Sequence, residues 1–195
     1  MPRSERCFNI LLGVSILSWA VLGLTATDEP QLTPVRLMIS ALHLFAGSLL
    51  LLRGPVERHG SVASCLAILS SLVVSGWAIG RAPTFHQWHL PAQLTFICGG
   101  VVALLGFVYL GRSFSILPAV RSTVVRGPFQ IVRHPAYLGE LIMILACSIA
   151  ELSLWSVAPL VATLPLVVLR ILAEERVLIT EPETTHDTLK RSGGG

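Results

Sequence analysis

The sequence predicts an all-α fold, a polytopic bundle of five to six transmembrane helices, and three observations support this. Hydrophobic residues make up 53% of the 195 residues and charged residues only 13%, against roughly 25% charged residues in a soluble domain. The apolar residues form runs of about 20, the length that a helix needs to cross a bilayer. The charged residues lie between these runs. We therefore expect lipid to be the main solvent of the chain.

Six apolar runs define the expected helices. They span about residues 7–26, 37–52, 62–80, 92–111, 136–150 and 154–173. Polar segments that contain proline separate the first four runs: Asp28-Glu29-Pro30, Arg53-Gly54-Pro55 and Arg81-Ala82-Pro83. Proline cannot continue a helix without losing a backbone hydrogen bond, so these segments mark helix ends. The fifth run is short for a full crossing, and we expect either a tilt or a thinner bilayer around it.

The first apolar run and the polar tail determine which residues we expect to belong to the folded domain. Run 7–26 follows Arg3 and Arg6, as a signal peptide would. Because it is longer than the usual apolar core of about 7–15 residues, we expect a retained membrane helix. Residues 180–195 are polar and end in three glycines, so we expect a disordered tail. Residues 1–179 are expected to form a single domain.

The cations predict the orientation, because cytoplasmic loops carry an excess of Lys and Arg. With six helices and a cytoplasmic N-terminus, the far side of the membrane holds only Arg36 and Arg81. The cytoplasmic side then holds eleven cations: Arg3, Arg6, Arg53, Arg58, Arg112, Arg121, Arg126, Arg133, Arg176, Lys190 and Arg191. Both termini are therefore expected in the cytoplasm, and the last two helices should form a hairpin that is open at that face.

Metal and nucleic-acid sites are not expected. The four cysteines all lie inside apolar runs: Cys7, Cys65, Cys98 and Cys147. They lack the C-x-x-C spacing of metal sites, and we expect small buried hydrophobic residues. His86 and His89 are three residues apart but have no third ligand nearby in the sequence. The cations do not gather on one polar face, as they would in a nucleic-acid-binding domain.

A first polar cluster precedes the fifth run. Pro135 suits the first turn of a helix, where its missing N–H costs nothing. Arg133 and His134 then lie at the helix N-terminus, where backbone N–H groups and the helix dipole favour a carboxylate or phosphate. A basic loop that binds lipid headgroups would look the same. Glu140 lies inside the apolar run, where a carboxylate is costly and indicates a partner.

A second polar cluster ends the sixth run. Arg170 and Glu174 are four residues apart and share a helix face, while Glu175 points about a third of a turn away. Such charges are also ordinary where a helix leaves the membrane. Together the two clusters suit a zwitterionic cosubstrate, because the first offers cations and the second offers carboxylates at the same end of the hairpin.

These motifs resemble those of a known family. Gly127-Pro128-Phe129, Arg133-His134-Pro135-x-Tyr137-x-Gly139 and Arg170-x-x-x-Glu174-Glu175 are similar to the signature of the isoprenylcysteine carboxyl methyltransferases, which the phospholipid methyltransferases share. Gly111-Arg112-Ser113-Phe114 and Arg121 resemble the approach to that signature. The resemblance covers about residues 105–178. It implies methyl transfer from S-adenosylmethionine inside a helical membrane protein, with the cofactor site at the cytoplasmic end of the last hairpin.

The resemblance also implies roles for individual residues. The residues implied to bind the cofactor are Arg121, Gly127, Phe129, Arg133, His134, Pro135, Tyr137, Leu138, Glu174 and Glu175. Arg170 would face the methyl acceptor and bind it. Arg170 and Glu174 would be the catalytic residues.

The acceptor class stays open. A carboxylate of the isoprenylcysteine type, our first expectation, needs no general base, and Arg170 could orient it. An amine or thiol, as in phospholipid N-methylation, must lose a proton, for which Glu174 or His134 would be the base. The expected partners are a lipophilic or prenylated acceptor and membrane lipid.

Two other interpretations remain. Membrane sterol reductases share an Arg-His-Pro-like motif but bind NADPH, so a reductase is one alternative. A membrane scaffold without enzymatic activity is the other.

Overall fold

A computed structural model describes residues 3–25, 32–52, 58–59, 62–111, 119–120 and 127–179. Its helices are α1 (Arg3–Thr25), α2 (Pro34–Leu51), α3 (Val62–Arg81), α4 (Leu90–Leu110), α5 (Pro135–Ala150) and α6 (Leu154–Ile179). The predicted all-α bundle is confirmed, and only α6 runs well beyond its expected end. The predicted tail, residues 180–195, lies outside the described residues.

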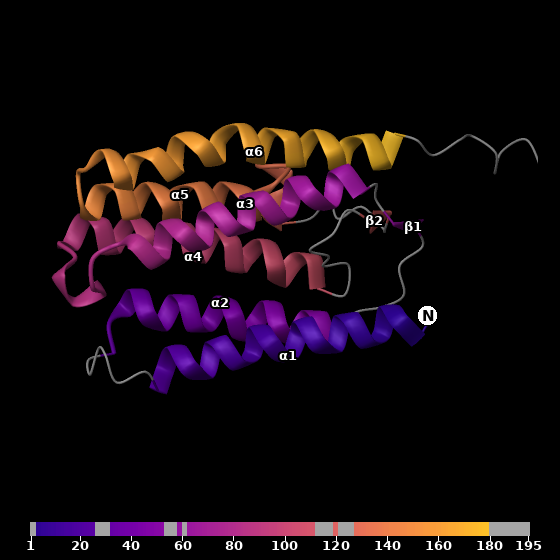
Figure 1. Cartoon of the computed structure of the whole chain (residues 1–195), viewed down its shortest axis with the longest axis horizontal. Helices are drawn as coiled ribbons and strands as arrows, with labels where there is room; N and C mark the ends of the chain where they lie inside the picture. The colour runs from indigo at the N-terminus through magenta and orange to yellow at the C-terminus, as the bar shows by residue number, and fades with distance from the viewer. Residues whose placement is uncertain are drawn as a thin grey trace, which may run out of the picture.

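The helices run lengthwise and alternate in direction (Figure 1). The N-terminus, the connections α2–α3 and α4–α5 and the end of α6 lie at one end of the bundle, which we call the N-terminal end. The connections α3–α4 and α5–α6 lie at the opposite, far end. At the N-terminal end two short strands, β1 (Arg58–His59) and β2 (Ala119–Val120), pair antiparallel and join two connections. The two clusters of the sequence therefore lie at one end, because α5 begins there and α6 ends there.

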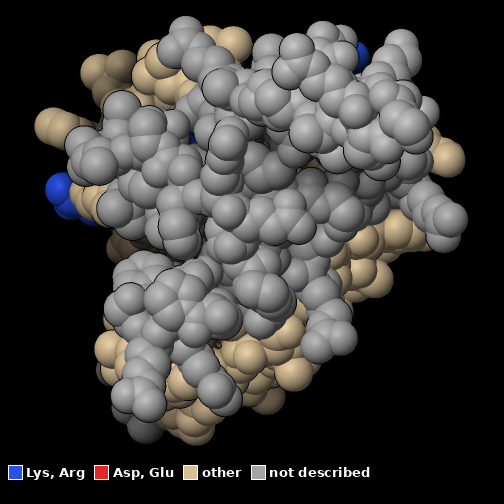
Figure 2. Space-filling view, turned by 90° about the vertical axis from the view of Figure 1, so that its right-hand side faces the viewer, with Lys and Arg blue, Asp and Glu red and all other residues tan. Residues whose placement is uncertain are grey.

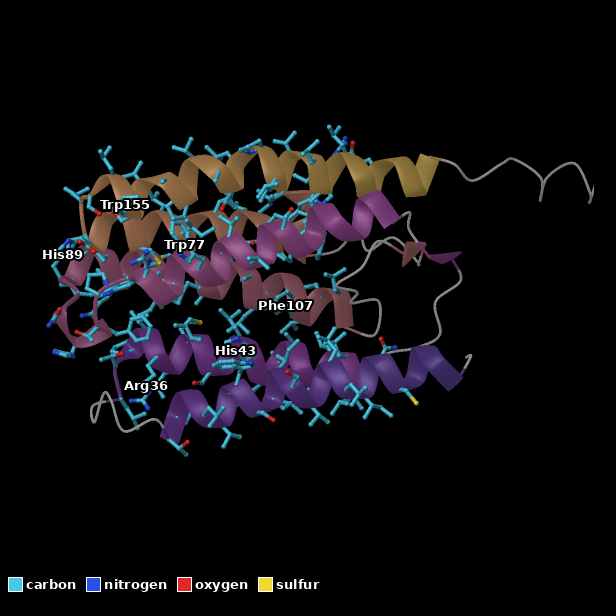
Figure 3. All side chains as sticks on the ribbon, viewed as in Figure 1. Arg36, His43, Trp77, His89, Phe107 and Trp155 are labelled. Atoms are coloured by element: carbon cyan, nitrogen blue, oxygen red, sulfur yellow. The ribbon has the colours of Figure 1, made fainter. Side chains whose placement is uncertain are left out.

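Several helices have the length and surface of membrane spans. Three are long and apolar enough to cross a membrane: Pro34–Leu51, Leu90–Leu110 and Leu154–Leu172. Asn9–Thr25 and Pro135–Ala150 are apolar but shorter. At the far end Trp77 and Trp155 are exposed (Figure 3), and the Arg81 guanidinium lies 5.7 Å from the Trp77 ring. Exposed Trp near a helix end is typical of a membrane–water interface.

Helices α4 and α5 approach at backbone distance. A Cβ atom on Gly139 would lie 2.5 Å from the carbonyl oxygen of Gly99 and 2.7 Å from the amide nitrogen of Ala103. A Cβ on Gly99 would lie 2.8 Å from the carbonyl oxygen of Gly139. Small residues allow such contacts between membrane helices, where dispersion forces rather than water drive packing. The two helices therefore form the rigid centre of the bundle.

His89 joins the same two helices at the far end (Figure 3). It is the N-cap of α4, and its Nδ1 accepts a hydrogen bond from the N–H of Ala92 at 3.3 Å. Nε2 must then carry the proton, and it donates to the carbonyl oxygen of Ile149 at 2.9 Å. His89 is therefore engaged as a helix cap and as a tie to the C-terminal end of α5.

The N-terminus of α5 lies further inside the bundle than the C-terminal ends of its neighbours, α4 and α6. It has 16 residues, against 21 in α4 and 26 in α6. Pro135 and Ala136 pack against Gly106, which lies about 6 Å along the helix before Leu110, the last residue of α4. The short length predicted for the fifth helix thus has a structural consequence, because it recesses the N-terminus of α5 between α4 and α6.

We predict that Gly139→Ala lowers the free energy of unfolding by about 1–3 kcal/mol, because the added methyl forces α4 and α5 apart. Gly76→Ala is the matched control, since a Cβ there meets nothing within 4 Å. It should be neutral or slightly stabilising. Denaturant titration in mixed micelles measures both variants, and equal effects would contradict the close contact.

Candidate active site

Three ionisable side chains meet at the recessed N-terminus of α5, and we call them the mouth cluster: Arg133, His134 and Glu175. His134 is the N-cap of α5, but its side chain makes no capping hydrogen bond. Arg133 Nη1 and His134 Nε2 each lie 3.9 Å from Glu175 Oε1 on α6. The Arg133 side chain is 88% exposed. Ion pairs this long and exposed contribute about 0–1 kcal/mol, so these groups can exchange their partners for a ligand.

Figure 2 views this end of the molecule. Among the described residues that it shows, Lys and Arg appear at a few places on the edge and uncharged residues prevail.

A second group of polar side chains lies further inside, and we call it the inner cluster: Glu140, Arg170, Ser75 and Tyr137. Arg170 Nη1 lies 3.3 Å from Glu140 Oε2, and the two side chains are only 8% and 13% exposed. Ser75 on α3 donates a hydrogen bond to Glu140 Oε1 at 2.5 Å. Both oxygens of the Glu140 carboxylate are therefore engaged, and one carboxylate links α3, α5 and α6.

Helix geometry explains how Glu140 and Arg170 meet. Every Cα–Cβ bond in a helix tilts toward the N-terminus of that helix. Because α5 and α6 are antiparallel, Glu140 tilts toward the N-terminal end of the bundle and Arg170 tilts toward the far end. The two side chains thus reach toward each other along the helix axes. Removing one partner of a buried ion pair costs about 3–5 kcal/mol.

Tyr137 connects the two clusters. The Arg170 guanidinium carbon lies 4.2 Å from the centre of the Tyr137 ring, within the range of a cation–π contact. The His134 ring lies parallel to the Tyr137 ring, with 5.4 Å between centroids and 4° between planes. Contacts therefore run without a break from Glu175 at the mouth, through His134, Tyr137 and Arg170, to Glu140.

The loop before α5 is held against α4 by a glycine. Gly127 opens the 3₁₀-helix η3 (Gly127–Gln130) with a φ of +63°. A Cβ atom here would collide with the Tyr109 ring of α4. Only glycine combines this backbone conformation with this close approach.

The structure brings together five of the predicted site residues: Arg133, His134, Tyr137, Arg170 and Glu175. Pro135 is buried as the first residue of α5, as its helix-start role predicts. Gly127 and Phe129 lie in η3 beside α4. Leu138 is exposed, and none of the contacts above involves it.

Two predicted site residues cannot be placed in these contacts. Arg121 and the side chain of Glu174 lie outside the described part of the structure.

Two residues of the inner cluster are absent from the predicted site. The sequence does signal Glu140, as a carboxylate in an apolar run that needs a partner, and the structure supplies Arg170 and Ser75. Ser75 has no such signal, since serine is common in membrane helices. Within the described residues, no three His, Cys, Asp or Glu gather as a metal site would require.

We predict that Gly127→Ala disturbs the mouth, because its methyl would push η3 away from Tyr109. Gly111→Ala is the matched control. Gly111 also has a positive φ, +47°, but a Cβ there meets nothing within 4 Å. Limited proteolysis of the purified protein should cut the segment before α5 faster in the Gly127 variant. Equal cleavage of both variants would contradict a specific role for the Tyr109 contact.

Comparison with known proteins identifies a family match over this part of the chain. Residues 88–181 match the family model described as phospholipid methyltransferase. The match covers α4, α5 and α6, and hence every residue of the two clusters except Ser75. No curated protein and no solved structure was found to match the chain. The resemblance read from the sequence is confirmed over residues 88–181, where the chain matches this family of integral membrane methyltransferases.

Proposed function

We propose that this protein uses S-adenosylmethionine to methylate a lipophilic acceptor at the recessed N-terminus of α5. The observation that carries the proposal is the mouth cluster, in which an arginine, a histidine and a carboxylate lie together within the segment that matches the family.

The mouth cluster fits the charges of the cofactor. The methionine part of S-adenosylmethionine carries a carboxylate and an ammonium group. Arg133 and His134 can bind the carboxylate, and Glu175 can bind the ammonium, in place of the 3.9 Å contacts that they make with each other. The first turn of α5, where the His134 side chain makes no capping hydrogen bond, adds the positive end of a helix dipole for the carboxylate.

Methyl transfer requires the protein mainly to position the methyl donor and the acceptor. S-adenosylmethionine supplies a methyl group already activated by its sulfonium, so an in-line displacement needs the acceptor atom held close and aligned. The recess of α5 between α4 and α6 offers a place where a lipid headgroup can meet the mouth while its chains stay in the membrane. We propose that this end faces the cytoplasm, because the Lys and Arg of the loops are concentrated there.

The inner cluster bears on the class of acceptor. A carboxylate acceptor of the isoprenylcysteine type would rely on Arg170, but Glu140 already balances that charge at 3.3 Å. Adding another carboxylate would bring an excess negative charge into a poorly solvated site. A neutral amine brings no such charge. Together with the phospholipid methyltransferase match, this favours a lipid with a nitrogen headgroup over a prenylcysteine carboxylate.

We predict that the detergent-purified protein binds S-adenosylhomocysteine, the demethylated cofactor, and does not bind NADPH. His134→Ala should weaken this binding by about 1–3 kcal/mol, the range for hydrogen bonds to a charged partner. Isothermal titration calorimetry measures both. The matched control is His86→Ala, because His86 is exposed in η1 (Phe85–Gln87) at the far end.

The outcomes separate the three functional interpretations. Binding that His134→Ala weakens and His86→Ala leaves unchanged supports the methyltransferase. Binding of NADPH alone would favour the reductase. A folded protein that binds neither ligand would favour the scaffold.

The acceptor class has its own prediction. With membranes, purified protein and S-adenosylmethionine labelled in its methyl group, we expect label in the lipid fraction that mild alkali does not release as volatile methanol, because an N-methyl group is stable to alkali. Label released by alkali as methanol would identify a methyl ester, and hence the carboxylate acceptor.

A further inference from the structure

The ion pair between Glu140 and Arg170 is more than the packing of the bundle requires. Charged side chains inside membrane segments are costly and usually functional, and an apolar pair of similar volume is often as stable as a buried ion pair. Helix α5 already has a tight partner in α4 through Gly99 and Gly139. The pair therefore needs a second explanation besides the attachment of α6 to α5.

The position of Arg170 supplies that explanation. Its guanidinium lies against both Glu140, at 3.3 Å, and the Tyr137 ring, at 4.2 Å. Without Glu140, Arg170 would lose the carboxylate that lies 3.3 Å from its guanidinium, and its long side chain would turn toward water at the N-terminal end, as Arg does near membrane surfaces. The guanidinium would then shift from its position over the Tyr137 ring, because Glu140 would no longer hold it at this depth in the bundle. Glu140 thus determines where the cation of Arg170 lies.

The Tyr137 ring links the position of the Arg170 guanidinium to the orientation of His134 at the mouth. Tyr137 is buried, and His134 lies parallel to it with an interplanar angle of 4°. The His134 side chain is 23% exposed, so the ring of Tyr137 is part of what shields it. The orientation of His134 toward Glu175 therefore depends on a ring that Arg170 helps to hold.

We infer that Glu140 is a positioning residue, which holds Arg170 over the Tyr137 ring and so fixes His134 at the mouth. The inference rests on the proposed function for its link to methyl transfer, because His134 is proposed to bind the cofactor. Its structural part concerns the orientation of His134 and can be tested without a ligand.

The first test follows the reaction of His134 with diethyl pyrocarbonate, which modifies accessible neutral imidazoles, by peptide mass spectrometry. Glu140→Gln keeps the size of the side chain and its bond to Ser75 but removes the charge. It should speed modification of His134 by about two- to thirtyfold, the range that loss of a desolvated cation–π contact implies. The exposed His86 at the far end is the internal reference. Glu151→Gln, at the exposed C-cap of α5, is the matched control and should leave the His134 rate unchanged.

A double variant separates positioning from simple attachment of the helices. Glu140→Gln with Arg170→Gln removes both charges and lets two amides pair. It should melt near the wild-type temperature but leave His134 as reactive as in the single variant, because no cation lies over Tyr137. Wild-type protection of His134 in the double variant, or in a folded single variant, would overturn the inference.

Affinity for S-adenosylhomocysteine distinguishes failure of this inference from failure of the proposed function. Weaker binding in both Glu140 variants, with wild-type binding in Glu151→Gln, supports both claims. If the wild type binds no cofactor but Glu140→Gln exposes His134, the proposed function fails and the positioning role stands. If the wild type binds and Glu140→Gln changes neither affinity nor His134 reactivity, the positioning role fails alone.

Discussion

A buried charge in an apolar bundle needs a partner of opposite charge, and the Glu140–Arg170 pair is where this protein meets that requirement. The carboxylate also accepts a hydrogen bond from Ser75, so three helices converge on it. The guanidinium lies over Tyr137, whose ring lies beside His134. The register of α5 against α6, and with it the geometry of the mouth, therefore depends on this one interaction.

The different lengths of the helices determine where the mouth cluster and the inner cluster lie relative to water. Because α5 is short and is tied to α4 at the far end by His89, its N-terminus lies below the ends of its neighbours. Charged groups at the mouth can thus reach water, while the inner cluster two turns away stays nearly dry. A charged cosubstrate and a lipophilic acceptor can meet at such a boundary without either one leaving its own solvent.

Local features of the sequence were enough to predict the helices, because hydropathy, run length and proline position act within one segment. Pro135 at the start of α5 is an example. The site depends on how helices rotate against each other, which no single segment specifies. The sequence offered both Glu174 and Glu175, and only the structure shows that Glu175 lies at the mouth, while the side chain of Glu174 lies outside the described part of the structure. Leu138 follows Tyr137 in the motif, but a step of one residue turns about 100° around the helix, and Leu138 is exposed.

The central claim is that a charged cofactor binds where α5 begins and α6 ends. Hydrogen–deuterium exchange with and without S-adenosylhomocysteine tests it most directly, because it reports the place of binding as well as its occurrence. The account predicts slower exchange in peptides that cover residues 127–138 and 171–179, and unchanged exchange around residues 84–90 at the far end. Slower exchange at the far end, or no change in a sample shown to be folded, would contradict the account.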